Sequence, residues 1–199
     1  MKTLIYNRQP AILQGLFLMF LMLGLSLLTL KTNAQTAMKI APGSQIKVNG
    51  TSNIHDWTMA AGSFSCDARF TLKQNQVQDV TALSFVLPVK NLKGKEDLLN
   101  SRAYKAMKED AHKNISFKMT SGSVAQNIIK VNGTLTIAGV AKPVALQAKA
   151  TVNADGTVTC VGSRKLKMSD HGIAPPSFML GALKVVDDIT IDFNLKLKK

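Results

Sequence analysis

Two histidine–aspartate pairs are the residues of this chain whose types and spacing could do chemistry. His55 precedes Asp56 in the stretch IKVNGTSNIHDW, residues 46–57, and His171 follows Asp170 in LKMSDHGI, residues 166–173. A histidine beside a carboxylate can act as a general base or contribute to a metal site. Neighbouring side chains on a β-strand point to opposite faces, however, so neither pair can converge on one substrate or ion by itself. We therefore interpret these histidines as hydrogen-bonding residues at the rim of a fold.

Other catalytic signatures are absent from the sequence. It contains no HxH or HExxH spacing, no GxSxG, no Walker loop and no dinucleotide-binding fingerprint. We predict a protein that is not an enzyme, with no catalytic residue, no metal and no cofactor. A hydrolase that uses His55 is the alternative.

The first 34 residues differ in kind from the rest. Lys2 and Arg8 precede the apolar run of residues 12–30, and KTNA then leads into Gln35. This order is typical of a cleaved signal peptide. We predict a signal peptide over 1–34 and one domain over 35–199, with the mature protein in the periplasm or secreted. The apolar run exceeds the usual length, so a leader retained as a membrane anchor is the alternative.

The expected mature chain is basic. All 12 acidic residues lie within residues 35–199 together with 22 of the 25 basic ones, a net charge of +10. The lysines alternate along strand-like segments such as QIKVN and FNLKLKK, without an arginine-rich patch that contains aromatics. This pattern predicts no nucleic-acid binding. It fits peripheral contact with an anionic membrane, or simply a solvated surface.

Two cysteines, Cys66 and Cys160, remain in the expected mature chain. After export they would meet an oxidising compartment, where a disulfide between them is allowed. Two buried thiols are the alternative.

A period of two dominates the sequence from residue 44 onward, as expected for half-buried strands. The stretch IKVNGT occurs twice, at 46–51 and 129–134, and alternation runs through both of its glycines. We interpret Gly50 and Gly133 as strand-interior positions where a barrel bends or a neighbour approaches. The predicted strands cover residues 46–54, 64–72, 83–89, 115–119, 129–137, 144–152, 158–168 and 189–197.

Residues 95–114 break this period. Acidic residues come early, and Leu99, Ala103 and Met107 follow at spacings of four, which predicts a helix over about residues 96–108. Many antiparallel strands with one inserted helix favour a closed barrel, because closure removes exposed sheet edges. We predict an all-β, antiparallel, eight-stranded, lipocalin-like barrel with one inserted α-helix. A two-sheet sandwich is the alternative.

Several segments together resemble a known family. They are NIHDW, KGKEDLLNSRAYKAM with HKNISFKM, the hairpin GTLTIAGVAKPVAL, and LKMSDHGI with DDITIDFNL, which span about residues 44–197. They are similar to the YceI-like family of exported, lipocalin-like, polyisoprenoid-binding proteins. The resemblance implies an antiparallel barrel whose elongated apolar interior holds an isoprenoid chain. The chain departs from the family at Met168, where an arginine is usual, and at His171, where an aromatic residue is common.

Strand phase and the resemblance predict a cavity lined by inward-facing residues. Small inward residues such as Ala148, Ala150 and Gly133 would leave room, whereas a filled core is the alternative. Arg164 falls on the inward phase, where it could meet a quinone carbonyl, a prenyl phosphate or a protein carboxylate, unless a bulge turns it outward. Phe178 lies in an apolar, proline-containing loop that could cover the barrel mouth, touch a membrane or plug the bottom. The predicted ligand-binding residues are Ile54, Trp57, Phe64, Phe70, Phe85, Leu87, Phe117, Leu135, Ile137, Arg164 and Phe178.

These expectations define a function. We predict an exported, monomeric or homodimeric lipid-binding protein that stores or transports a polyisoprenoid or isoprenoid quinone. The alternative is a basic exported stress or interaction protein with a filled barrel that associates with anionic membrane surfaces.

Overall fold

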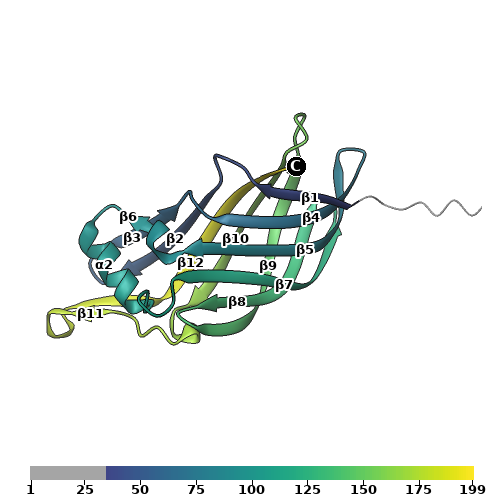
Figure 1. The fold of residues 1–199 in the computed structure, drawn as a ribbon. Coiled ribbons are helices and arrows are strands. Elements are labelled where there is room, and N and C mark those ends of the chain that lie inside the picture. Colours follow the sequence, from purple (N-terminus) through teal and green to yellow (C-terminus); the bar gives the residue numbers. More distant parts are fainter. Residues whose placement is uncertain (1–34) are drawn as a thin grey trace, which may run out of the picture. The chain divides into compact units, whose positions relative to one another are not determined.

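The computed structural model describes residues 35–199 (Figure 1). The predicted signal peptide, residues 1–34, lies outside the described residues. Besides the helix α2 (Asp97–Ala106), there are short 3₁₀ turns at Val89–Asn91 and Ser169–His171. The strands are β1 (Gln35–Ile40), β2 (Gln45–Ser52), β3 (Asp56–Ala61), β4 (Ser65–Lys73), β5 (Gln76–Pro88), β6 (Lys93–Gly94), β7 (Asn114–Ala125), β8 (Ile128–Ile137), β9 (Val140–Val152), β10 (Val158–Lys167), β11 (Ser177–Phe178) and β12 (Leu183–Lys198).

Eight of these strands close into an antiparallel ring. Their order is β1-β4-β5-β7-β8-β9-β10-β12, and β12 returns to β1 through the pairs Lys39↔Lys198 and Ile40↔Leu197. The predicted eight-stranded barrel is therefore confirmed, and the two-sheet sandwich is not formed. Closure leaves one face of each ring strand directed at a shared interior, as the period of two predicts.

The opening motif IKVNGTSNIHDW forms a hairpin, so the prediction of one strand through residue 54 is wrong. β2 ends at Ser52, and the chain reverses into β3 at Asp56. The Ser52 hydroxyl accepts hydrogen bonds from the Ile54 and His55 amides, while the Asn53 side chain donates to the Ala182 carbonyl. These bonds turn the chain although the hydrophobic alternation continues.

The hairpin extends the sheet from β12 and is not among the eight ring strands, although Ile46 of β2 is buried in the core. β2 pairs with the middle of β12, β3 pairs with β2, and β6 pairs with β3. The ring position expected for residues 46–54 belongs instead to β1, which pairs with β4. The extension β2-β3-β6 and the helix α2 lie at the same end of the barrel (Figure 1).

The helix occupies the predicted region. Its inner side packs Leu99, Ala103 and Tyr104 against the core, and the Tyr104 hydroxyl donates to the carbonyls of Lys90 and Leu92. Beyond its C-terminus, the buried carboxylate of Glu109 pairs with Lys90 and Lys113 at 3.6 and 3.2 Å. These contacts fix the helix across the barrel end.

Candidate functional site

A cavity of about 140 Å³ lies inside the ring. Seven predicted ligand-binding residues line it: Phe70, Phe85, Leu87, Phe117, Leu135, Ile137 and Arg164. Ile129, Ile191 and Phe193 also line it, and they share the strand phase of the predicted residues. Apart from Gln147 and Arg164, every lining side chain is apolar or a cysteine. Such a wall accepts hydrocarbon and offers few groups to an acid–base reaction.

This central cavity is narrow. The strands β5 and β9 approach each other across the ring. Its volume of about 140 Å³ is close to that of a cavity of about 150 Å³ which binds one benzene molecule. The barrel centre therefore holds about one five-carbon unit and is neither a wide tunnel nor a fully packed core.

A larger outer cavity of about 550 Å³ lies at the helix end. It is bounded by α2, the β2–β3 hairpin and the segment 168–189, and it contains the predicted residues Trp57 and Phe178. Ile115 and Ile137 line both this cavity and the central one, so the two spaces adjoin. Together they offer a mostly apolar path from the barrel interior to the underside of the helix, although the outer cavity is also lined by Asp56, Lys95, Glu96 and Arg102.

Phe178 is held over the outer cavity from the helix side. The Arg102 guanidinium, on α2, lies 3.8 Å from the centre of the Phe178 ring. A cation over an aromatic face is attracted by the electron-rich ring. This contact joins the loop before β12 to the helix and supports the interpretation of Phe178 as a cover at the barrel mouth.

Trp57 forms another part of the outer cavity wall. Its ring lies against Gly50, its cross-strand partner, so closely that a Cβ at position 50 would lie 2.2 Å from the ring. Gly50 is therefore a site of close approach, as predicted. The Trp57 Nε1 atom is the one buried side-chain nitrogen or oxygen of residues 35–199 without a hydrogen-bond partner.

Both histidine–aspartate pairs contribute a histidine to the outer cavity. His171 is buried, and its Nδ1 donates to the Val140 carbonyl at 3.1 Å; His55 makes the same kind of bond to the Asp56 carbonyl at 2.9 Å. Neither imidazole is oriented by its neighbouring carboxylate. Among residues 35–199, no three histidine, cysteine or acidic residues are grouped as a metal site would need.

Two predicted residues lie elsewhere. Ile54 is 62% exposed on the turn between β2 and β3, because the strand ends before it. Phe64 precedes β4 and packs against Phe85 from outside the cavity, with ring centroids 5.4 Å apart and ring planes tilted by 56°. Phe64 thus supports a cavity residue without lining the cavity itself.

Cys66 and Cys160 are free thiols in the wall of the central cavity, so the disulfide considered from the sequence is not formed. Burial raises the pKa of both thiols to about 12, and the nearby Cys160 and Asp67 add to the rise at Cys66. Both sulfurs therefore act as neutral, apolar lining at ordinary pH.

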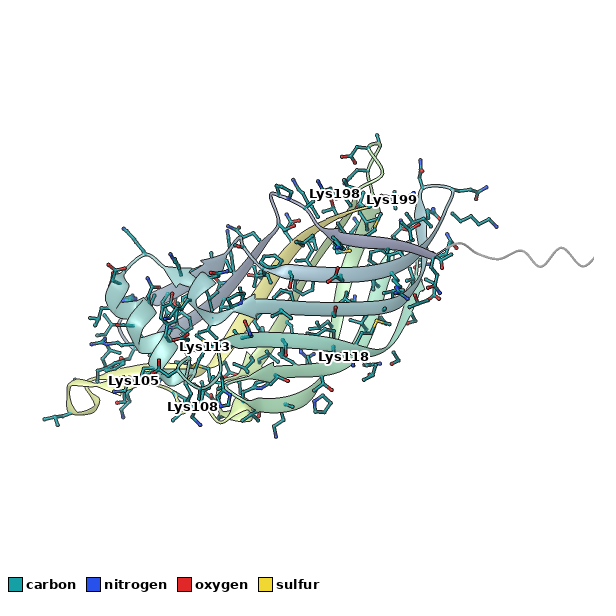
Figure 2. All side chains as sticks on the ribbon, viewed as in Figure 1. Lys105, Lys108, Lys113, Lys118, Lys198 and Lys199 are labelled. Atoms are coloured by element: carbon teal, nitrogen blue, oxygen red, sulfur yellow. The ribbon has the colours of Figure 1, made fainter. Side chains whose placement is uncertain are left out.

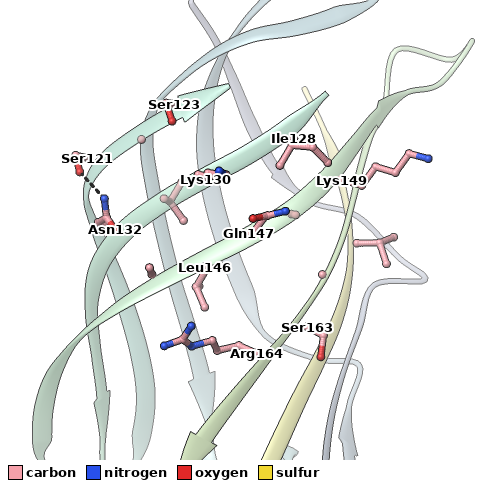
Figure 3. A pocket seen from close by; sticks show the side chains of 16 residues that line it. Ser121, Ser123, Ile128, Lys130, Asn132, Leu146, Gln147, Lys149, Ser163 and Arg164 are labelled. Carbon is pink, nitrogen blue, oxygen red and sulfur yellow. Dashed lines mark hydrogen bonds between the residues drawn. The ribbon is translucent and has the colours of Figure 1, made fainter. Parts of the chain in front are cut away.

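The ring opens sideways between β9 and β10. Their ladder stops at the pair Val161↔Lys149. Beyond it, β10 continues to pair only with β12, and β9 only with β8. The two strands diverge in a wedge, and Arg164 extends from β10 into it (Figure 3). This region, which we call the β9–β10 opening, is continuous with a groove of about 840 Å³ across β7, β8, β9 and β10.

The groove and the central cavity share part of their walls. Leu146, Gln147 and Arg164 line both. Arg164 lines the central cavity, as its strand phase predicts, but its side chain is exposed and not buried. Lys130 and Lys149 also line the groove, and no aspartate or glutamate lines either space.

Positive charge elsewhere is dispersed. Lys105, Lys108 and Lys113 lie near the helix end, and Lys198 and Lys199 near the other end of the barrel (Figure 2). Among residues 35–199, no helix has the length and apolar character needed to cross a bilayer.

Comparisons with known proteins agree with this geometry. The YceI-like domain matches residues 33–197 of the chain. A search of curated proteins found no match.

The solved structures that share the fold include the following three. BcnA of Burkholderia cenocepacia superposes with a TM-score of 0.66 at 18% identity, covering 77% of this chain and 95% of its own. A polyisoprenoid binding domain from Saccharophagus degradans, implicated in plant cell wall breakdown, has a TM-score of 0.61 at 12% identity and covers 83% and 99%. The Campylobacter jejuni YCEI protein has a TM-score of 0.54 at 20% identity and covers 67% and 81%.

Proposed function

The chain belongs to the YceI-like family, and from this membership and its apolar interior we propose that it binds a polyisoprenoid or an isoprenoid quinone for storage or transport. The observation that carries the proposal is the path formed by the central and outer cavities, which adjoin at Ile115 and Ile137. The name of the Saccharophagus degradans domain, a polyisoprenoid binding domain, supports the same ligand class.

The size of the path sets the expected affinity. Scaled from the benzene cavity, the spaces of about 140 and 550 Å³ together have room for roughly 28 hydrocarbon carbons, so a chain of about 15 carbons, or three isoprene units, fits within them. Burying that many carbons yields about 12 kcal/mol at ~0.8 kcal/mol each. Association and chain ordering offset several kcal/mol, so micromolar binding is within reach without any catalytic group.

The proposal includes export and a purely binding role. The basic and apolar order of residues 1–34 is that of a signal peptide, which supports a periplasmic or secreted protein. The histidines bond to main-chain carbonyls and not to carboxylates, which supports ligand binding in preference to hydrolysis.

A second candidate function is association with an anionic membrane surface. It is favoured by two exposed apolar residues, Ile54 and Leu180, each at the tip of a hairpin. The two tips lie side by side, because the Asn53 side chain next to Ile54 bonds to the backbone of Ala182 and Lys184 in the other hairpin. Salt-sensitive binding to anionic vesicles without uptake of a prenyl chain would favour this candidate over lipid storage.

The test of the main proposal is direct. The full-length chain is expressed in a bacterial host, and the purified protein is extracted with organic solvent and examined by mass spectrometry. We expect a prenyl lipid in stoichiometric amount. A folded protein that carries no such lipid and takes up none from solution would contradict the proposal.

A further inference from the structure

Arg164 is the one cationic residue in the wall of the central cavity. Its side chain reaches into the β9–β10 opening below Leu146 (Figure 3). Both ion pairs among residues 35–199 involve Glu109, so the Arg164 guanidinium has no carboxylate partner there. A cation at the edge of an apolar cavity, without an internal counter-ion, points to a ligand that brings negative charge.

The backbone geometry explains why the Arg164 guanidinium lies at an opening in the barrel wall. The β10 strand touches β9 at Gly162, where a Cβ would lie 2.3 Å from the Gln147 carbonyl oxygen. Past this contact the ladder between the two strands has ended. The facing strand edges therefore carry main-chain polar groups without ladder partners, which makes the opening polar.

The charges around the opening have one sign. Lys130, Lys149 and Arg164 line the groove, while no acidic residue lines the groove or the central cavity. A guanidinium presents several donors in a plane that matches the oxygens of a phosphate or carboxylate. A neutral carbonyl would accept from only some of these guanidinium donors and would leave the positive charge of Arg164 uncompensated.

We propose that the β9–β10 opening binds the anionic head group of an amphiphile, a phosphate or a carboxylate, with Arg164 as its principal cation. The tail then runs past Leu146 and Ala148, which line both spaces, into the central cavity. This inference rests on the proposed lipid-binding function and specifies its ligand class. It favours a prenyl phosphate or a fatty acid over a neutral quinone.

Three probes separate the head-group claim from the tail claim. Farnesol and farnesyl phosphate have the same tail and differ in charge, and palmitate offers a carboxylate on an unbranched tail. Binding to the full-length protein is measured by calorimetry at low and high salt. We expect farnesyl phosphate to bind at least tenfold more tightly than farnesol at low salt, with the advantage shrinking at high salt. Comparing the affinities for palmitate and farnesyl phosphate then shows whether the site prefers a carboxylate on an unbranched tail or a phosphate on a prenyl tail.

Two variants locate the effect. Arg164→Met should reduce the affinity for farnesyl phosphate to about that for farnesol, a loss of at least tenfold, and change the affinity for farnesol much less. The matched control is Lys165→Met, which removes the same charge from the next residue of β10, one that lines neither the groove nor the cavities.

Each outcome has a defined meaning. Equal binding of farnesol and farnesyl phosphate, or an equal effect of the two variants, overturns the head-group inference and leaves the proposed function standing. Absence of binding by all three probes overturns the proposed function and this inference with it.

Discussion

Filling the central cavity should weaken lipid binding without unfolding the barrel. Ala148, on β9, is the smallest side chain in the cavity wall. Ala148→Leu adds three carbons to a space of about 140 Å³, which has room for about six by the benzene comparison. Three ligand carbons lose their burial, which costs about 2.4 kcal/mol and weakens binding about 50-fold.

The assay compares farnesol affinity and thermal unfolding in the same preparation. Since the new carbons enter existing space, we expect the free energy of unfolding to change by no more than about 1.5 kcal/mol. The control is Ala141→Leu, the same change at an exposed position of β9 that lines none of the cavities. Unchanged farnesol affinity in folded Ala148→Leu would refute the argument that the ligand tail occupies the ring interior.

Two further predictions concern the cavity walls. Gly50→Ala places a Cβ 2.2 Å from the Trp57 ring, so it should cost about 1–3 kcal/mol of stability and shift the emission of this sole tryptophan. Gly62→Ala, whose Cβ would meet nothing nearer than 3.8 Å, should do neither, and equal effects would contradict the prediction. Because the folded-state pKa of both thiols is about 12 against an ordinary 9.0, their contribution to stability is present below pH 9 and lost as pH rises toward 12. Between pH 9 and 12, the free energy of unfolding of the wild type should fall more steeply than that of a Cys66→Ala, Cys160→Ala variant. The same pH dependence in both proteins would contradict the raised pKa of the buried thiols.

Strand alternation was sufficient to predict the central cavity. Phe70, Phe117 and Leu135 share one phase of their strands, and closure of the ring turns that phase inward. The same reasoning placed Arg164 on the inward phase correctly. Its exposure depends on where the β9–β10 ladder ends. The end of that ladder is set by the pairing of two strands, and the alternation within either strand does not predict it.

The outer cavity could not be predicted in the same way. Ile54 continues the alternation of β2, but the Asn53 side chain bonds to Ala182, 129 residues later, and the chain turns before it. β1 has only six residues and one buried side chain, Met38, too few for a periodic signal. The space under the helix is built from such long-range contacts, so only Trp57, Ile137 and Phe178 of its wall were expected.

The most direct test of the central claim is the identity of the lipid that the protein carries. Native mass spectrometry of the full-length protein purified without detergent, followed by release of the bound mass, measures it. We predict one prenyl-containing lipid per barrel, displaced by added farnesyl phosphate and depleted in Ala148→Leu. A barrel of wild-type sequence that is folded, carries no lipid and gains no mass from prenyl probes would contradict the account.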